Sequence, residues 1–279
     1  MSLLVAVLTL AVANAIAVGA MLLLRRRAPS GSFFQDTQQA AGVFSVTGTT
    51  FAVLVAFTFL LAFQSFDRAR TASQDESTST TALFHTAELF PVASRDALRG
   101  DIVCYARAVI YKEWPSMREN QQSRSVRGWI RALERDFEAV EVRGVKAEAA
   151  FSNWFDQTQQ RARARRQRLD EAAPFVPPIV WLFLIFGGVV VIAFVGYFAD
   201  RRERRFSQTG MIFAVTTMVV ASLLMVRFLD SPYDDQSGSI KPNAMAESLA
   251  TMNGEDAAVT PGVHPRCDRQ GAQTAGIGA

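Results

Sequence analysis

The apolar residues of this chain are concentrated in four runs, each near the roughly 20 residues that a helix needs to cross a bilayer. The runs are Leu3 to Leu24, Val43 to Phe63, Val176 to Phe198 and Met211 to Leu229. The second run holds no charged residue, and as a helix rising about 1.5 Å per residue it is roughly 30 Å long. We therefore predict four transmembrane helices.

The second span is predicted to continue far beyond its apolar part. After Phe63 the sequence turns polar, but it holds no Gly or Pro until Pro91, so one helix can run to about Phe90. Further helices are predicted from a cap at Ser94 to Trp114-Pro115, over Val126 to Val140, and from about Val145 to Glu171. No run here alternates with the period of two that marks a strand.

The predicted fold class is therefore all-α: a four-span transmembrane protein with a helical bundle of about 110 residues between spans two and three. The chain divides into 1–64 (spans one and two), 65–173 (the bundle, continuous with span two), 174–229 (spans three and four) and 230–279 (a polar C-terminal tail). The tail is expected to be largely disordered after about residue 252 because it is rich in Gly, Ala and polar residues.

One face of span two runs from small residues to bulky aromatic ones. Gly48, Ala52, Val55, Phe59 and Phe63 fall within one sector of the helical wheel. Small residues commonly let another membrane helix approach closely, and packing against a neighbouring helix is one interpretation. The other is that the stripe faces a pore in an oligomer, where Val55, Phe59 and Phe63 form an apolar constriction.

Charge on the short loops predicts the orientation in the membrane. Three arginines stand at 25–27 and four within 201–205, and short loops rich in arginine stay in the cytoplasm. This places the termini and the helical bundle outside the cytoplasm. Cys104 and Cys267 then share an oxidising compartment and could pair, although two unpaired buried thiols are the favoured expectation.

The sequence holds no recognisable catalytic constellation. The chain has only two histidines, and neither a phosphate-binding loop, a nucleophile elbow nor a Gly-rich dinucleotide loop is found. We expect no enzyme activity, no cofactor and no metal site. The formal net charge of +3 does not gather into a nucleic-acid footprint, so no nucleic-acid partner is expected.

Several short elements carry a family resemblance in combination. They are Gly48-Thr49-Thr50-Phe51-Ala52, Phe66-Asp67-Arg68-Ala69-Arg70, Tyr105-Ala106-Arg107 leading to Glu113-Trp114-Pro115-Ser116-Met117, and Leu229-Asp230-Ser231-Pro232-Tyr233. Over about residues 40 to 252 the chain resembles the bestrophin-like family of bacterial membrane proteins, long catalogued as a domain of unknown function. We interpret Phe66, Asp67, Arg68, Glu113, Trp114, Pro115, Asp230, Pro232 and Tyr233 as structural.

Within the Glu-Trp-Pro element, we expect Pro115 to stop the helix and Trp114 to pack against the bundle. Glu113 is expected to cap the helix or to pair with Arg107 or Arg118.

The resemblance implies a homo-oligomer, because bestrophins are pentameric anion channels with four spans whose helices line a central pore. Bulky apolar residues one turn apart form the pore neck in bestrophins, and Val55, Phe59 and Phe63 match that spacing. The implied partners are the lipid bilayer, further copies of the chain and an inorganic anion. The orientation departs from the family: bestrophins hold their large helical portion in the cytoplasm, whereas the arginines of the short loops place the bundle of this chain outside. The alternative function is a membrane-anchored interaction or sensory protein without transport activity.

Overall fold

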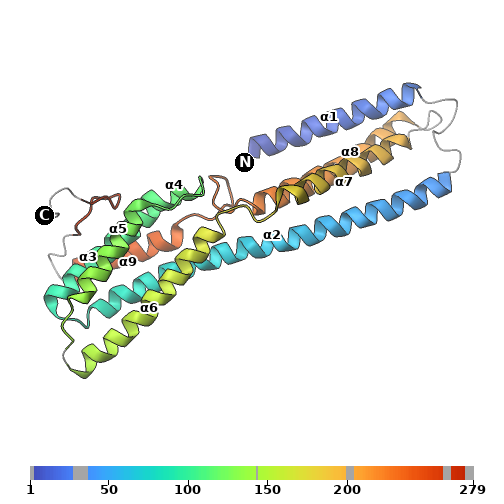
Figure 1. Ribbon diagram of the computed structural model, residues 1–279. Coiled ribbons are helices and arrows are strands. Elements are labelled where there is room, and N and C mark those ends of the chain that lie inside the picture. The colour runs from blue at the N-terminus through green and yellow to red at the C-terminus, as the bar shows by residue number, and fades with distance from the viewer. Residues whose placement is uncertain (1–2, 28–36, 143, 199–203, 260–264, 274–279) are drawn as a thin grey trace. The chain divides into compact units, whose positions relative to one another are not determined.

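The structure is a computed structural model that describes residues 3–27, 37–142, 144–198, 204–259 and 265–273 (Figure 1). Over these residues the chain is helical, and its only β-type pairing is an isolated bridge between Cys267 and Gln273. The elements are α1 (Leu3–Arg27), α2 (Thr37–Ala87), α3 (Val92–Ala108), the π-helix η1 (Val109–Glu113), α4 (Trp114–Met117), α5 (Arg124–Glu138), α6 (Val145–Asp170), α7 (Pro178–Tyr197), α8 (Arg205–Leu229) and α9 (Asn243–Val259).

Helices α1, α2, α7 and α8 are long and apolar enough to cross a membrane. The prediction of an all-helical protein with four such helices is confirmed for the described residues. The long polar extension of the second span is also present, because α2 is one helix of 51 residues.

The chain forms two compact units, and α2 contributes to both. The membrane unit comprises residues 1–66, 174–231 and 235–238, and the bundle unit comprises 67–173, 232–234 and 239–279.

In the membrane unit, α1, α7 and α8 pack against one another, as Figure 1 shows. Their buried core includes Ala17, Met21 and Ile212. Two polar pairs join α1 to α8: Asn14 Nδ2 donates to Thr217 Oγ1 at 3.2 Å, and Arg25 Nη1 donates to Gln208 Oε1. Such pairs satisfy polar side chains that are buried between packed spanning helices.

Helix α2 meets α7 and α8 mainly through aromatic rings. Near the start of α2, the Phe44 ring lies 6.1 Å from the rings of Phe194 on α7 and of Phe198, the residue after α7. At the other end of the part of α2 that belongs to the membrane unit, the Phe66 ring lies 6.0 Å from the Phe228 ring on α8. Between these contacts, the Phe51 ring packs on Gly187, where an added Cβ would clash with it at 2.7 Å. Gly187 therefore permits the close approach of α2 to α7.

The bundle unit buries Leu83, Phe84, Leu98 and Tyr105 completely or nearly so. A second apolar group is built of stacked and edge-to-face rings from the turn after α2, from α5 and from α6. Its members are Phe90, Phe137, Phe151, Trp154 and Phe155. The rings fill the space between α5, α6 and the turn after α2. The periodic apolar positions of the sequence predict these helices.

Two predicted helix boundaries in the bundle are wrong. Ser94 lies inside the first turn of α3, which begins after Pro91 and has no side-chain cap. The helix also passes Pro115, which occupies the first turn of α4, and ends at Met117. A proline is tolerated in a first turn because the N–H it lacks has no partner there, and η1 starts a new turn immediately before it.

Candidate functional site

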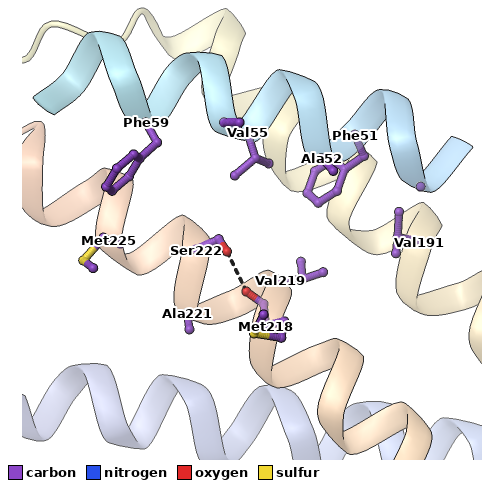
Figure 2. A pocket seen from close by; sticks show the side chains of 12 residues that line it. Phe51, Ala52, Val55, Phe59, Val191, Met218, Val219, Ala221, Ser222 and Met225 are labelled. Atoms are coloured by element: carbon purple, nitrogen blue, oxygen red, sulfur yellow. Dashed lines mark hydrogen bonds between the residues drawn. The ribbon is translucent and has the colours of Figure 1, made fainter.

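An apolar groove of about 640 Å³ lies within the membrane unit, between α2 and α8 (Figure 2). Helix α2 contributes residues between Gly48 and Phe59, α8 contributes residues between Met218 and Met225, and α7 contributes Val191. The one polar lining side chain is Ser222, whose hydroxyl donates to the carbonyl oxygen of Met218 at 2.8 Å. The groove therefore offers hydrocarbon surface and no free hydrogen-bonding group among its lining residues.

The three residues of the predicted constriction are placed differently. Val55 and Phe59 line the groove, whereas Phe63 does not. The phenylalanines keep 36% (Phe59) and 50% (Phe63) of their surface exposed. A different face of α2 is exposed as well, with Val53, Phe57 and Leu60 at 50% or more. A neighbouring subunit, a pore or lipid could therefore meet α2 on either of two faces.

A buried ion-pair core joins three segments of the bundle unit. Arg168 of α6 donates from Nε to Glu76 Oε2 of α2 at 2.5 Å and from Nη2 to Glu113 Oε2 of η1 at 2.7 Å. Arg165, one turn earlier on α6, also pairs with Glu113. The hydroxyl of Tyr105 donates to Glu76 Oε1 at 2.6 Å. Two carboxylates and two guanidinium groups thus neutralise each other away from water.

The expected partners of Glu113 were wrong, because Glu113 binds Arg165 and Arg168 rather than Arg107 or Arg118. Burial raises the pKa of Glu113, but the adjacent charge of Arg168 and the hydrogen bonds and charge of Arg165 more than offset this, so the net pKa lies below its usual value. Burial raises the pKa of Tyr105, and the carboxylate of Glu76 raises it further. Glu113 is therefore charged and Tyr105 neutral at physiological pH.

Trp114 and Tyr233 join the motif elements within the bundle unit. Their rings meet edge to face at 5.5 Å, and Trp114 Nε1 donates to the Ile240 carbonyl oxygen at 3.3 Å. The Tyr233 hydroxyl donates to the Ala69 carbonyl oxygen of α2 at 2.9 Å. The Arg168 guanidinium lies 5.1 Å from the Trp114 ring centroid, so the ion-pair core and the aromatic pair are adjacent.

Asp230 organises the segment before α7. One of its carboxylate oxygens accepts from the backbone N–H of Val176 at 2.8 Å, and the other accepts from Trp181 Nε1 at 3.3 Å. Arg227 pairs with the same carboxylate at 3.7 Å. Pro232, two residues on, accepts at its carbonyl oxygen from the N–H of Ile240 at 2.8 Å.

The Phe66-Asp67-Arg68 stretch has contacts in both the membrane unit and the bundle unit. Phe66 packs on Phe228 in the membrane unit, whereas Arg68 Nε binds Glu171 Oε1 at 2.6 Å in the bundle unit. Asp67 is exposed.

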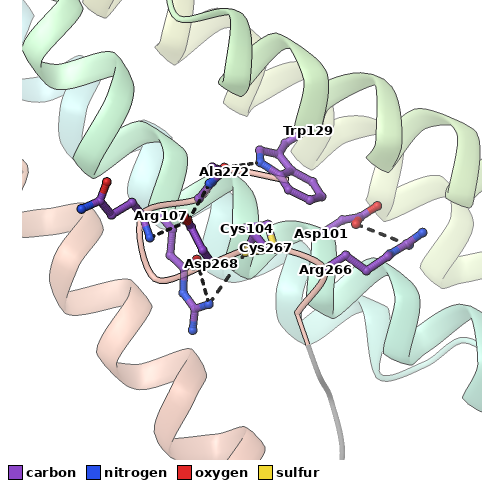
Figure 3. Close-up of a disulfide and its surroundings, with 10 residues drawn as sticks. Asp101, Cys104, Arg107, Trp129, Arg266, Cys267, Asp268 and Ala272 are labelled. Carbon is purple, nitrogen blue, oxygen red and sulfur yellow. Dashed lines mark hydrogen bonds and ion pairs between the residues drawn. A yellow bond between two sulfur atoms is a disulfide. The ribbon is translucent and has the colours of Figure 1, made fainter. Parts of the chain in front are cut away.

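Cys104 and Cys267 form a disulfide, so the expectation of two unpaired thiols was wrong (Figure 3). Figure 3 shows residues of the tail lying along α3 and α5 around this bond. Trp129 Nε1 donates to the Gly271 carbonyl oxygen at 2.7 Å, and an added Cβ at Gly271, which has a φ of +76°, would clash with the Ala108 backbone.

The chain after residue 252 was expected to be largely disordered. Instead, α9 extends to Val259, and residues 265–273, here called the tail strap, dock on the bundle.

The tail strap also covers a buried acid. Asp101 has 0% exposure, and Arg266 of the strap lies 3.4 Å from its carboxylate and binds Asp136 as well. Burial raises the pKa of Asp101 to about 7, with Asp136 adding to the rise while Arg266 and Arg135 oppose it. Asp101 is thus a titrating group near neutral pH that is held under the tail strap.

Among the described residues, no group of three or more His, Cys, Asp or Glu side chains is arranged to hold a metal ion. The helix lengths, the apolar groove and the ion-pair core together define an integral membrane protein with a helical extramembrane part.

A family model described as the Bestrophin-like domain matches residues 11–245. The chain belongs to the bestrophin-like family. A comparison with curated proteins finds no match.

Solved structures share the fold at low sequence identity. A variant of a bacterial bestrophin homologue from Klebsiella pneumoniae aligns with a TM-score of 0.63 at 12% identity, covering 90% of this chain and 98% of the other. A second variant of that homologue aligns with a TM-score of 0.62 at 13% identity, covering 91% and 100%. A structure described only as a membrane protein aligns equally well, with a TM-score of 0.62 at 13% identity and 91% and 99% coverage.

Two features of the bundle escaped the sequence analysis. One is the burial of Arg165 and Arg168, which the sequence analysis did not single out, whereas Arg163 and Arg166 on the same helix are exposed. Arg161, Arg165 and Arg168 are spaced by four and three residues, so they lie on one face of α6, and this spacing was the available signal for a buried face. Nothing in the local sequence indicated the pairing of Cys104 with Cys267, which are 163 residues apart.

We predict that Trp114→Ala destabilises the bundle unit by roughly 3 to 5 kcal/mol, because it removes a ring that is only 3% exposed and leaves a cavity. Thermal or denaturant unfolding of the detergent-solubilised protein measures this loss. Phe155→Ala, at a ring that is half exposed, is the matched control and should cost much less. Unchanged melting of Trp114→Ala would contradict the packing role.

A second prediction concerns pH. The folded pKa of Asp101 lies above its unfolded value of 3.8, so its contribution to stability is complete below about pH 4 and is lost as pH rises to about 7. Within that range the free energy of unfolding should fall by up to about 1.4 kcal/mol per pH unit from this group. In Asp101→Asn the fall in the free energy of unfolding per pH unit should be smaller by that amount. Equal slopes in the wild type and the variant, measured by unfolding at pH 4 to 7, would refute the assignment.

Proposed function

We propose that the protein is a homo-oligomeric, bestrophin-like ion channel that passes inorganic anions, with α2 lining the pore. The observation that carries the proposal is the match to the Bestrophin-like domain over residues 11–245, which includes the spanning part of α2 with Phe59 and Phe63. In the bestrophins that the sequence resembles, bulky apolar residues one turn apart form the neck of an anion pore. A pentamer is the proposed assembly on the same grounds.

The proposed constriction is formed by Val55, Phe59 and Phe63. Val55 and Phe59 also line the groove, and Phe59 and Phe63 are partly exposed. In an oligomer each position would form a ring about the axis. Rings of aromatic side chains exclude water from a narrow pore, so an ion meets a desolvation barrier there until the rings separate. No charged residue lies in the apolar part of α2, so the proposed constriction acts through dewetting rather than through charge.

We also propose that the bundle unit lies outside the cytoplasm. The arginines of the two short connections favour the cytoplasmic side for those connections. The disulfide between Cys104 and Cys267 supports the same orientation because such bonds persist in oxidising compartments. This orientation is opposite to that of the large helical portion of bestrophins, so the pore proposal and the orientation proposal need separate tests.

Replacing Phe59 and Phe63 together by alanine should raise anion flux into liposomes, by about tenfold for each 1.4 kcal/mol of barrier removed. Purified protein is reconstituted and chloride efflux is compared with that of empty liposomes. The matched control is Phe57→Ala with Leu60→Ala, which removes two exposed side chains from another face of α2. The control should leave flux unchanged.

Two results would contradict the pore assignment. Higher flux in the Phe57 and Leu60 variant alone would place the pore on that other face of α2. Background flux in all proteins, with weakened assembly after loss of Phe59 and Phe63, would favour a membrane-anchored interaction or sensory protein.

The orientation is tested with single cysteines in a background of Cys104→Ser and Cys267→Ser. Ser207 and Gln122 are both exposed, one beside the second short connection and one in the bundle unit. In intact cells a membrane-impermeant thiol reagent should label Gln122→Cys and should label Ser207→Cys only after lysis. The reverse pattern would place the bundle unit in the cytoplasm.

A further inference from the structure

The buried face of α6 carries a third arginine besides the two of the ion-pair core. Arg161 is only 2% exposed, and its guanidinium lies 4.8 Å from the centroid of the Tyr105 ring. Arg165 and Arg168 bind carboxylates, whereas Arg161 has no carboxylate partner among the described residues. In that same part of the chain, its buried Nε and Nη1 atoms also have no hydrogen-bond partner.

Arg161 leaves the buried charges of this face unbalanced. In the ion-pair core two guanidinium groups face two carboxylates, so the core is neutral by itself and Arg161 adds one positive charge. A guanidinium stays protonated in proteins, so burial does not remove this charge. A cation–π contact offsets only part of the cost of taking a charge out of water. A counter-charge is therefore expected beside Arg161.

A second buried donor stands next to Arg161. Thr158 precedes it by three residues on α6, and side chains at this spacing are neighbours on one face of a helix. The Thr158 hydroxyl oxygen is buried and has no hydrogen-bond partner within the described ranges. The residue as a whole is partly exposed, so the hydroxyl lies just beneath the surface of the bundle unit. A small solute could reach the pair from there.

The chemistry of the two side chains selects the ligand. Water would accept their hydrogen bonds but would not balance the charge, and a cation would be repelled. A carboxylate of another protein does not reach a guanidinium that is so completely enclosed. A single excess positive charge is matched by a monovalent ion that only accepts hydrogen bonds, and the enclosure favours a small one.

We propose that Arg161 and Thr158 bind chloride or another small monovalent inorganic anion within the bundle unit. The site is built from α6, whereas the proposed pore is lined by the spanning part of α2. The inference therefore goes beyond the proposed channel and does not require conduction.

The test measures how chloride changes the stability of the full-length protein in detergent. Unfolding is followed over a chloride series in which gluconate keeps the ionic strength constant. Above the dissociation constant, the ratio of folded to unfolded chains should rise about tenfold for each tenfold rise in chloride, because the ion binds only the folded state. Arg161→Met, which keeps a long unbranched side chain without the charge, should lose this dependence. In gluconate alone this variant should be at least as stable as the wild type, because it removes a buried charge that lacks a counter-charge.

Two exposed arginines on the same helix provide matched controls. Arg163→Met and Arg166→Met remove the same charge from exposed positions and should keep the chloride dependence of the wild type. Thr158→Val keeps the shape of the side chain and loses the hydroxyl. It should raise the chloride concentration that gives half of the effect by roughly tenfold, as the loss of one hydrogen bond to a charged group does. In crystals grown with bromide, the anomalous signal should lie within hydrogen-bond distance of the Arg161 guanidinium.

Three results would overturn the inference. An equal chloride dependence in the wild type and Arg161→Met would place the ion elsewhere. A wild type that does not respond to chloride would exclude the site, and an Arg161→Met variant that is then less stable at every chloride concentration would identify Arg161 as a structural cation held by Tyr105. A bromide signal found only along the spanning helices would assign the ion to the membrane unit. Flux in liposomes is a separate measurement, so its absence would count against the channel and leave the anion site standing.

Discussion

The buried pairing of Arg168 with Glu76 and Glu113 is the constraint on which the bundle unit depends. Three segments, α2, η1 and α6, each place a charge where water cannot solvate it. If one segment moved away, its charged partner would remain buried without a counter-charge. Removing one member of such a set is far more destabilising than the set is stabilising, because the desolvation penalty of the remaining charge is then uncompensated. The pairing therefore specifies which helix faces meet. The π-helix contributes to this, since its wider turn alters the direction of Glu113 relative to Tyr105. The two side chains thereby bind different members of the set: Glu113 binds Arg168, and Tyr105 binds Glu76.

Local patterns in the sequence predicted the helices well because a helix depends on residues three and four positions apart. The four spans and the polar continuation of the second appear as α1, α2, α7 and α8. Tertiary partners are not encoded in that way. Glu113 was assigned to the nearby Arg107 or Arg118, whereas its partners lie 52 and 55 residues away on another helix. Pro115 was expected to end a helix, and it does not, because a change of helix type precedes it. The constriction of Val55, Phe59 and Phe63 remains a proposal, since a single chain shows which faces of α2 are exposed but not what an oligomer brings against them.

The membrane unit shows how a long helix can be held at a small number of points. Phe44, Phe51 and Phe66 contact α7 or α8, and between them α2 stands away from α8 across the groove. Small residues on α2 leave this space open, while Gly187 on α7 lets a ring approach closely. The match to bacterial bestrophin homologues at 12 to 13% identity shows that the fold persists although most side chains differ. The arrangement of helices is thus more strongly constrained than the identity of the residues that line the groove.

The position of the disulfide along the chain has a consequence for biogenesis. Cys104 lies in the bundle segment made before α7 and α8, whereas Cys267 follows both of those helices. The bond therefore cannot form on a growing chain until the last two spans have been synthesised and the tail strap has returned to α3. An oxidised pair marks a chain that has been made at least as far as Cys267, and a chain arrested after α6 keeps Cys104 as a free thiol. The redox state of Cys104 therefore distinguishes chains that carry α7, α8 and the tail strap from chains that lack them.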